Sequence, residues 1–249
     1  MTHKGEKKHL KRTTAPKFWS IHRKESKFTI NPSAGPHSTM NCIPLLIIIR
    51  DILNLADTAR EAKYIINTGN IKIDGVIRRD IKYPVGLMDI LEIPKMNSSY
   101  RIIPIPRKGL IPHLIEAEEE KKFKLCRIEN KSLVKGGHIQ LNLHDGRNIV
   151  IRLNDPKNTE EDIYKTKDVL KISVPSQEIL EYIKFDENTF SLVISGRNLG
   201  LTGRIIKIEK LFGPYASTVT LESEGKTFQT SLEYAFPIGV DQSLISLPN

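Results

Sequence analysis

The sequence predicts a multi-domain α+β fold that is mostly β. Its 249 residues exceed the usual size of a single domain. Helical patterns are strongest at 43–55, where Pro44 falls in the first turn, and at 58–68. Short β-like runs separated by Gly, Pro, Asn and Asp follow, with a helical turn or two expected at 114–123 and 176–183. Such runs favour small barrels or meanders over a doubly wound sheet.

The positive charge is concentrated towards the N-terminus. Residues 1–28 hold nine Lys and Arg against two acids, whereas residues 111–249 hold eighteen against twenty. Prolines and a glycine interrupt any period in residues 1–40, which we expect to form an extended basic arm. A basic arm is typical of a polyanion binder, although it also fits a solubilising tail. Trp19 and neighbouring aromatics lie among the basic residues, which favours nucleic acid because bases stack on aromatic rings.

Residues 56–80, "ADTAREAKYIINTGNIKIDGVIRRD", combine a helix, its stop signal and a hairpin; we call this segment the joint. Thr58 and Glu61 have the spacing of a capping box at the start of the helix. Gly69 stands where the helix is expected to stop in a left-handed conformation. Asp74-Gly75 is a strong signal for a two-residue hairpin turn. The joint is therefore predicted to be a rigid corner.

Basic groups gather on this corner. Arg60, Lys63 and Asn67 share the helix face opposite the apolar stripe, and the hairpin carries Lys72 and an Arg-Arg pair at 78–79. Ordered basic groups suit shaped, structured RNA, because little conformational entropy is lost on binding. An ordinary α/β joint with a hydrated basic face is the alternative that periodicity leaves open.

The segment "IRDILNLADTAREAKYIINTGNIKIDGVIRRDIKYPVGLMDILEI" (49–93) resembles the small RNA-binding module named after small-subunit ribosomal protein four. That module consists of two helices followed by a β-rich part. It also occurs in pseudouridine synthases and in some tRNA synthetases. This resemblance alone implies an RNA binder and little more.

Other segments narrow the resemblance to the archaeal and eukaryotic-type ribosomal protein four family, in its archaeal form. Residues 9–37 resemble the basic N-terminal arm of that family, and "LVKGGHIQLNLHDGRNIVI" (133–151) resembles its central domain. "VISGRNLGLTGRIIKIEKL" (193–211) is similar to its KOW motif, and "KTFQTSLEYAFPIG" (226–239) to its closing segment. Ser195 departs from the pattern, since a second glycine is expected beside Gly196.

The resemblance implies four parts: a basic arm (1–40), a small helical RNA-binding module (41–106), a central β domain (107–173) and a KOW-containing SH3-like barrel with the C-terminal segment (174–249). It implies a structural constituent of the small ribosomal subunit in the cytoplasm. Small-subunit rRNA and neighbouring small-subunit proteins are the expected partners. The expected RNA-binding residues are Lys11, Arg12, Trp19, His22, Arg23, Lys24, Lys27, Arg60, Lys63, Asn67, Asn70, Lys72, Arg78, Arg79, Arg197, Asn198 and Arg204.

We expect no enzyme, because the sequence lacks the necessary patterns. The Gly-Arg pairs at 146–147 and 196–197 lack the following acid of a pseudouridine synthase loop, and Thr220 replaces the first glycine of a P-loop. No CxxC or HExxH pattern is present, so we expect no metal, cofactor or small-molecule substrate. The apolar run at 43–49 is too short to span a membrane.

Two other classes of protein share parts of the pattern. A free RNA-modifying or RNA-chaperone factor using the same module is the leading alternative. A KOW-type transcription elongation factor is disfavoured, because it leaves the arm and the module unexplained.

Overall fold

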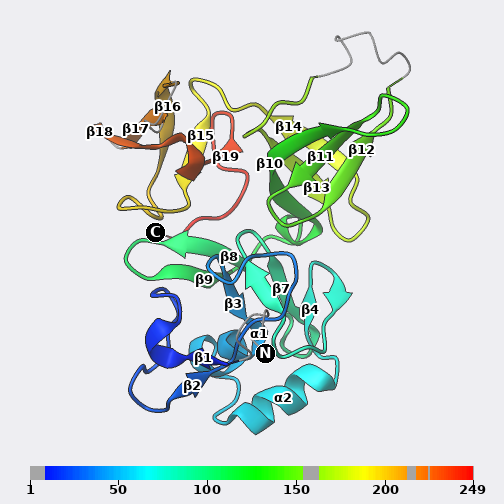
Figure 1. Cartoon of the computed structure of the whole chain (residues 1–249), viewed down its shortest axis with the longest axis vertical. Coiled ribbons are helices and arrows are strands. Elements are labelled where there is room, and N and C mark those ends of the chain that lie inside the picture. Colours follow the sequence, from blue (N-terminus) through cyan, green and yellow to red (C-terminus); the bar gives the residue numbers. More distant parts are fainter. Residues whose placement is uncertain (1–8, 154–162, 212–216, 224, 249) are drawn as a thin grey trace, which may run out of the picture. The chain divides into compact units, whose positions relative to one another are not determined.

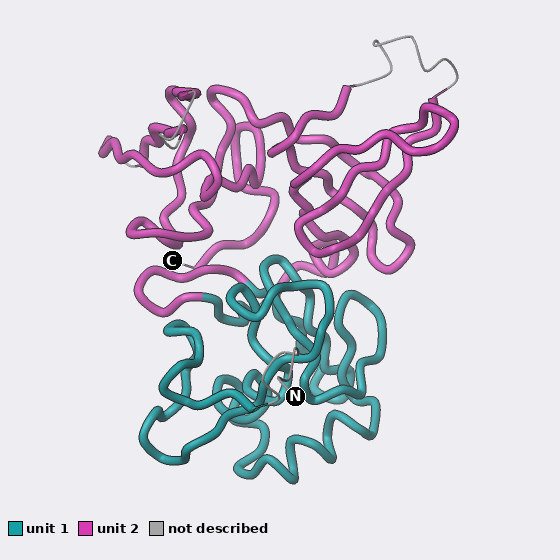
Figure 2. Tube along the Cα trace, in the orientation of Figure 1, with its two compact units in different colours: residues 1–102, 110–114 teal, residues 103–109, 115–249 magenta. Residues whose placement is uncertain are grey.

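The computed structural model describes residues 9–153, 163–211, 217–223 and 225–248 (Figure 1). The chain forms two compact units (Figure 2). Unit 1 contains residues 1–102 and 110–114, and unit 2 contains residues 103–109 and 115–249. Strands outnumber helices throughout the described part, which confirms the mostly β, α+β class. No helix in these ranges is long and apolar enough to cross a membrane.

Unit 1 is built around a five-stranded antiparallel sheet with the order β5-β4-β7-β8-β9, accompanied by the pairs β1-β2 and β3-β6. Its strands are β1 (Leu10–Lys11), β2 (Phe28–Thr29), β3 (Cys42–Pro44), β4 (Lys72–Ile73), β5 (Val76–Ile77), β6 (Pro84–Gly86), β7 (Ile90–Ile93), β8 (Ser98–Ile105) and β9 (Gly109–Leu114). Its helices are α1 (Leu45–Ile47), the π-helical η2 (Ile48–Ile52), α2 (Ala59–Asn67) and the 3₁₀ turns η1 (Arg12–Thr14) and η3 (Pro94–Met96). The tip of the β8–β9 hairpin, residues 103–109, groups with unit 2.

The first helix starts later than the sequence predicts. Ile43 and Pro44 belong to β3, and the helix begins at Leu45, continuing as a π-helix to Ile52. Pro44 has an extended backbone, with ψ of 138°, and pairs with Pro84 of β6. Residues 45–49 of this segment are buried and pack with Ala62 and Ile66 of α2 in the core of unit 1, whereas residues 50–52 are half-buried.

Residues 9–40 do not form the extended arm that the sequence predicts. Ala15 and Trp19 belong to the buried core of unit 1. The Ser33 amide donates to the Lys82 carbonyl at 2.9 Å, and His37 Nε2 lies 3.1 Å from Asp89 Oδ1 in a buried pair. The apolar residues of this segment gain more from burial than an extended arm gains from hydration, so the segment folds onto the module.

Unit 2 contains two further five-stranded antiparallel sheets, with the orders β12-β11-β10-β13-β14 and β18-β17-β16-β15-β19. The first sheet comprises β10 (Phe123–Leu133), β11 (Ile139–Leu143), β12 (Asn148–Ile151), β13 (Val169–Ser173) and β14 (Ile179–Ile183). The second comprises β15 (Phe190–Val193), β16 (Thr202–Glu209), β17 (Thr218–Ser223), β18 (Lys226–Ser231) and β19 (Ala235–Gly239). The 3₁₀ turns η4 (Glu120–Lys122) and η6 (Leu232–Tyr234) complete the described elements of this unit.

Of the two helical turns expected in this half of the sequence, the one at 114–123 forms and the one at 176–183 does not. Within 114–123 only the short turn η4 forms, and 176–183 contains strand β14 instead of a helix. Pairing with β13 decides the second case, because it places Ile183 opposite Val169 and Ile179 opposite Ile172. Tertiary pairing here overrides a weak local helix preference.

Each sheet of unit 2 has its own buried cluster, one around Leu141 and Leu170 and one around Ile205 and Leu221. The guanidinium of Arg127, on β10, links the two sheets. Its Nη1 donates to the carbonyl oxygens of Glu233 at 2.8 Å and Ala235 at 3.2 Å. Nε and Nη2 of the same guanidinium contact the Glu129 carboxylate, so hydrogen bonds and an opposite charge offset the cost of burying this arginine.

Candidate nucleic-acid interface

Local signals in the sequence place the start of α2. The Glu61 amide donates to Thr58 Oγ1, and the Thr58 amide donates to Glu61 Oε2, both at 3.3 Å. This reciprocal pair is the predicted capping box, and it satisfies two amides at the helix start. Backbone donors from Thr58 and Asp57 lower the pKa of Glu61 below its ordinary value. The helix is therefore fixed at its first turn.

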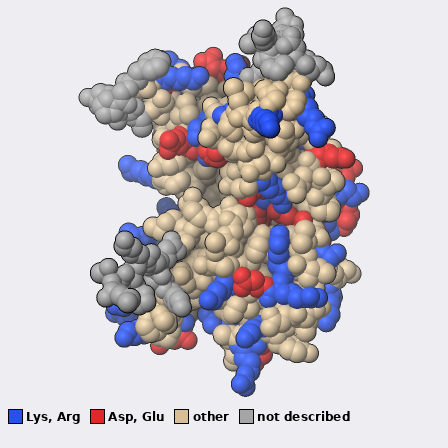
Figure 3. All heavy atoms as spheres, turned by 45° about the vertical axis from the view of Figure 1, so that its right-hand side comes forward, with Lys and Arg blue, Asp and Glu red and all other residues tan. Residues whose placement is uncertain are grey.

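One face of α2 is exposed and carries two basic residues. Arg60, Lys63 and Asn67 are exposed, while Ala62 and Ile66 on the opposite side are buried. Figure 3 shows Lys and Arg side chains at the lower end of the view, where Figure 1 places α2. The predicted division of the helix into an apolar and a basic face is confirmed at these residues, whereas Ala59 on the apolar side is exposed and Ile65 is half-buried.

The helix end and the hairpin come together as predicted. Gly69 has a φ of +77°, and a Cβ atom there would lie 3.3 Å from Ile77 Cγ2 and 3.5 Å from Arg79 Nε. Arg79 therefore lies against the C-terminal end of α2. The Asn70 side-chain amide donates to Thr68 Oγ1 and so helps to hold this turn.

The hairpin itself is tight and anchored. Lys72 pairs with Ile77 across the two-residue turn Asp74-Gly75, in which both residues have positive φ, as the type I′ geometry requires. The buried carboxylate of Asp74 accepts a hydrogen bond from the Ile90 amide at 3.0 Å. The hairpin is thus fixed to β7 and presents Lys72 from a rigid strand.

Arg78 differs from its neighbours in the joint. Its guanidinium lies 4.7 Å from the centre of the Tyr83 ring, which is cation–π geometry. It is half-buried, whereas Arg79 is exposed. Arg79 is therefore better placed than Arg78 for contact with a ligand.

The joint carries cations that the described part of the chain does not neutralise. Among the described residues, Arg60, Lys63, Lys72 and Arg79 have no ion-pair partner. Basic residues of unit 2 more often do, as in the pairs Lys171–Glu181 at 3.2 Å and Lys207–Glu209 at 2.7 Å. Rigidly held cations without intramolecular partners favour an anionic ligand.

Three residues expected to bind RNA have structural roles instead. Trp19 is only 2% exposed, and its Nε1 donates to the Cys42 carbonyl at 2.8 Å, so it cannot stack on a base. Arg12 is buried and paired with Glu25 at 2.8 Å. The guanidinium of Arg23 donates to three carbonyl oxygens, those of residues 12, 15 and 16, at 2.7–2.9 Å. Stacking by Trp19 is therefore ruled out by its burial, whereas Arg12 and Arg23 make contacts within the fold and their contact with RNA stays a prediction.

The other predicted residues of this segment remain at the surface. Lys11, His22, Lys24 and Lys27 are exposed. The ammonium of Lys27 lies 5.4 Å from the centre of the Phe28 ring, which is itself 45% exposed. An exposed aromatic ring beside a lysine retains the combination that suits a nucleic acid.

The predicted residues of unit 2 lie around the loop between β15 and β16. Arg197 and Arg204 are exposed. The Asn198 side-chain amide donates to the Gln229 carbonyl at 3.0 Å, so it holds the loop to β18. Gly200 packs closely against Pro106, since a Cβ atom at position 200 would lie only 2.6 Å from it, so a larger residue would clash there.

Tyr64 is a surface residue that the sequence analysis did not single out. This residue lies on the exposed face of α2 with Arg60, Lys63 and Asn67, and its side chain is 72% exposed. The sequence held a usable signal, because Tyr64 stands two positions from each of the buried residues Ala62 and Ile66. On a helix, that spacing points a side chain away from the core.

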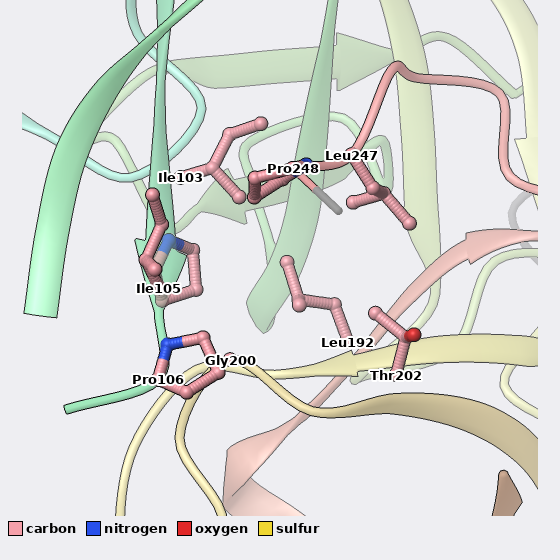
Figure 4. A pocket seen from close by; sticks show the side chains of 9 residues that line it. Ile103, Ile105, Pro106, Leu192, Gly200, Thr202, Leu247 and Pro248 are labelled. Carbon is pink, nitrogen blue, oxygen red and sulfur yellow. The ribbon is translucent and has the colours of Figure 1, made fainter. Parts of the chain in front are cut away.

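Three features bear on metal binding and acid–base chemistry in the described residues. They contain no group of three or more His, Cys, Asp or Glu arranged to hold a metal ion. Burial raises the pKa of the Cys42 thiol to about 12, so it does not supply a thiolate. A pocket of about 130 Å³ in unit 2 is lined by Ile103, Pro104, Ile105, Pro106, Leu192, Gly200, Thr202, Leu247 and Pro248 (Figure 4). None of these side chains ionises, so the pocket supplies no acid or base.

Comparisons with known proteins agree over the whole chain. The profile of the RS4NT (NUC023) domain matches residues 4–40, and that of ribosomal family S4e matches residues 96–179. The small ribosomal subunit protein eS4 of Staphylothermus marinus is 55% identical, over 100% of this chain and 98% of that protein. The protein of the same name from Methanocaldococcus jannaschii is 47% identical, over 99% of this chain and 100% of its own length.

A solved structure is also similar. The crystal structure of the 30S ribosomal protein S4e from Thermoplasma acidophilum aligns with a TM-score of 0.67 and 35% identity, covering 80% of this chain and 95% of that one. The full-length relatives extend this likeness over the whole chain. The chain belongs to the ribosomal family S4e.

Proposed function

We propose that this chain is a structural constituent of the small ribosomal subunit and binds rRNA through the joint. The binding of rRNA is supported by the cations of the joint that have no ion-pair partner among the described residues. They lie on ordered elements and favour contact with a phosphate backbone. Family membership over the full length of its relatives supports the first part. The exposed Lys11, Lys24 and Lys27 would add further phosphate contacts.

Several finer assignments belong to the same proposal. The sheet from β15 to β19 is the KOW-containing SH3-like barrel, supported by its strand order and by the positive φ of Gly196 in the β15–β16 loop. The sheet from β10 to β14 is the central β domain. Arg197 and Arg204 are secondary RNA contacts. Neighbouring small-subunit proteins are further partners, in the cytoplasm.

A free RNA-modifying or RNA-chaperone factor is less well supported. The relatives described above are ribosomal proteins, and the Asp145 of the loop "HDGRN" is committed to a buried ion pair with Lys124 at 2.9 Å. We therefore assign no catalytic role to the chain.

Sedimentation tests the proposed function directly. Native lysate is separated on a sucrose gradient after a high-salt wash, and fractions are probed for this chain. A structural constituent is expected in the small-subunit fractions, at one copy per subunit. Recovery at the top of the gradient would instead identify a free factor.

Removing two cations from α2 is expected to weaken RNA binding. Arg60→Ala with Lys63→Ala should reduce affinity for small-subunit rRNA by about tenfold or more, since two phosphate contacts are lost. The slope of log Kobs against log salt should become less steep by about 1.4 to 1.8. Filter binding across a salt series measures both quantities.

Lys135→Ala with Lys184→Ala is the matched control, because both lysines are exposed in unit 2 and the same charge is removed. Equal losses in the two double variants would show that total charge, rather than the joint, determines binding.

A further inference from the structure

Tyr64 is the most exposed aromatic side chain in the described ranges, at 72%, compared with 45% for Phe28 and 36% for Tyr234. Within those ranges, neither its ring nor its hydroxyl makes a hydrogen bond, a ring contact or a cation–π contact. Burial of a tyrosine ring contributes stability, so leaving it in water forgoes that gain. The stability of the fold therefore does not explain why a tyrosine occupies this exposed position.

The helix geometry also shows that the Tyr64 side chain is directed away from the core. Successive residues of an α-helix are rotated by about 100°, so positions two before and two after a residue flank the opposite side of the helix. Ala62 and Ile66 occupy those positions, and both are fully buried. Tyr64 thus points directly away from the core of unit 1. Helix propensity does not explain it either, because tyrosine is a weaker helix former than alanine, leucine or lysine.

The surroundings of Tyr64 select one kind of partner. Arg60 lies one turn before it, Asn67 lies nearly one turn after it, and Lys63 adjoins it; all three are exposed. An aromatic contact with an apolar protein surface would force the two cations to be desolvated without compensation. A nucleic acid instead offers a flat base to the ring and phosphates to the cations.

We propose that Tyr64 stacks on an unpaired nucleobase, so that α2 prefers RNA with a bulged or looped-out base over a fully paired helix. This inference rests on the proposed binding of rRNA through the joint and names the kind of RNA bound there. In a paired helix the bases are stacked on one another and closed to a side chain, whereas an unpaired base can be splayed onto an aromatic ring. Arg60 and Lys63 would neutralise the flanking phosphates.

Two RNA hairpins test the proposal with the full chain. One is fully paired, and the other is identical except for a bulged 2-aminopurine, whose fluorescence falls when it stacks. The unsubstituted chain is expected to bind the bulged hairpin about tenfold or more tightly than the paired one, from a single stacked base, and to quench its fluorescence. Tyr64→Ala should abolish this preference and the quenching, and leave affinity for the paired hairpin unchanged.

Further variants separate this inference from the proposed function. Tyr64→Phe keeps the ring and should keep the preference, whereas Tyr234→Ala, an exposed tyrosine of unit 2, should not alter it. Arg60→Ala with Lys63→Ala should weaken binding of both hairpins and leave the preference between them. If Tyr64→Ala retained the preference and the quenching, the stacking role would be overturned while the cation result could still support the joint as the RNA site.

Discussion

Trp19→Ala is expected to lower the free energy of unfolding of unit 1 by about 3–5 kcal/mol, the usual cost of removing a large buried aromatic side chain. The ring lies in the core of unit 1 with Ile43 and Leu45. Its removal also takes the Nε1 donor from the Cys42 carbonyl. Thermal unfolding of the full chain, followed by far-ultraviolet circular dichroism, should show the transition of unit 1 at a markedly lower temperature.

A conservative variant separates loss of packing from loss of the indole donor. Trp19→Phe keeps an aromatic ring in the core and should retain more stability than Trp19→Ala. Because Trp19 is the only tryptophan, the tryptophan fluorescence of the unsubstituted chain measures the environment of this one side chain. Its emission should be typical of a buried indole and change little on adding rRNA. Strong quenching by RNA, with unfolding unaltered in Trp19→Ala, would restore the stacking role that the sequence suggested.

The joint is the part of the site that the sequence predicts best, because its signals are local. A capping box involves residues three apart, a left-handed stop needs one glycine, and a type I′ turn needs two residues with positive φ. The cap at Thr58, the stop at Gly69 and the backbone turn at Asp74-Gly75 each involve neighbours in the chain, although the Asp74 carboxylate also bonds the distant Ile90 amide. These features do not depend on the rest of the fold, so periodicity and turn chemistry are sufficient to find them.

The N-terminal segment shows where such reasoning ends. Trp19 and Arg23 have the composition of an RNA-binding arm, but their partners are decided by tertiary folding. The acceptor for Trp19 Nε1 is 23 residues away, and Arg23 binds three carbonyl oxygens of an irregular turn. No spacing of residues in the sequence predicts the contacts of Trp19 or of Arg23. A basic, aromatic segment is consistent with both a surface and an interior location.

The buried charges of unit 2 were also beyond prediction. Lys124 alternates with apolar residues along β10 and reads as a solvent-facing position of a strand, yet it is fully buried beside Asp145. The loop containing Asp145 reads as an ordinary turn, so nothing local marks its carboxylate as the partner. Pairing across sequence distance determines which charges are interior.

Asp145→Ala is expected to cost about 3–5 kcal/mol of stability, because it removes a carboxylate from beside a buried ammonium group. Asp145 Oδ2 lies 2.9 Å from Lys124 Nζ and 3.2 Å from Arg147 Nε. The surface pair Lys207–Glu209 provides the control, since Glu209→Ala should cost much less stability than Asp145→Ala. Urea unfolding of unit 2 measures both changes, and equal costs would contradict a special role for the buried pair.

The pH dependence of stability gives an independent test of the same pair. Burial is the largest single influence on Asp145 and opposes its ionisation, but the nearby charges of Lys124, His144 and Arg147 and the hydrogen bond from Lys124 together outweigh it and lower the pKa of the carboxyl group from 3.8 to about 2. Between these two values the unfolded chain binds more protons than the folded chain, so stability falls as pH falls through this range. The contribution, about 2 kcal/mol, is complete above about pH 4 and lost towards pH 2. Asp145→Ala should lose less stability than the unsubstituted chain over this interval, and an unchanged slope would mean that Asp145 does not ionise beside Lys124.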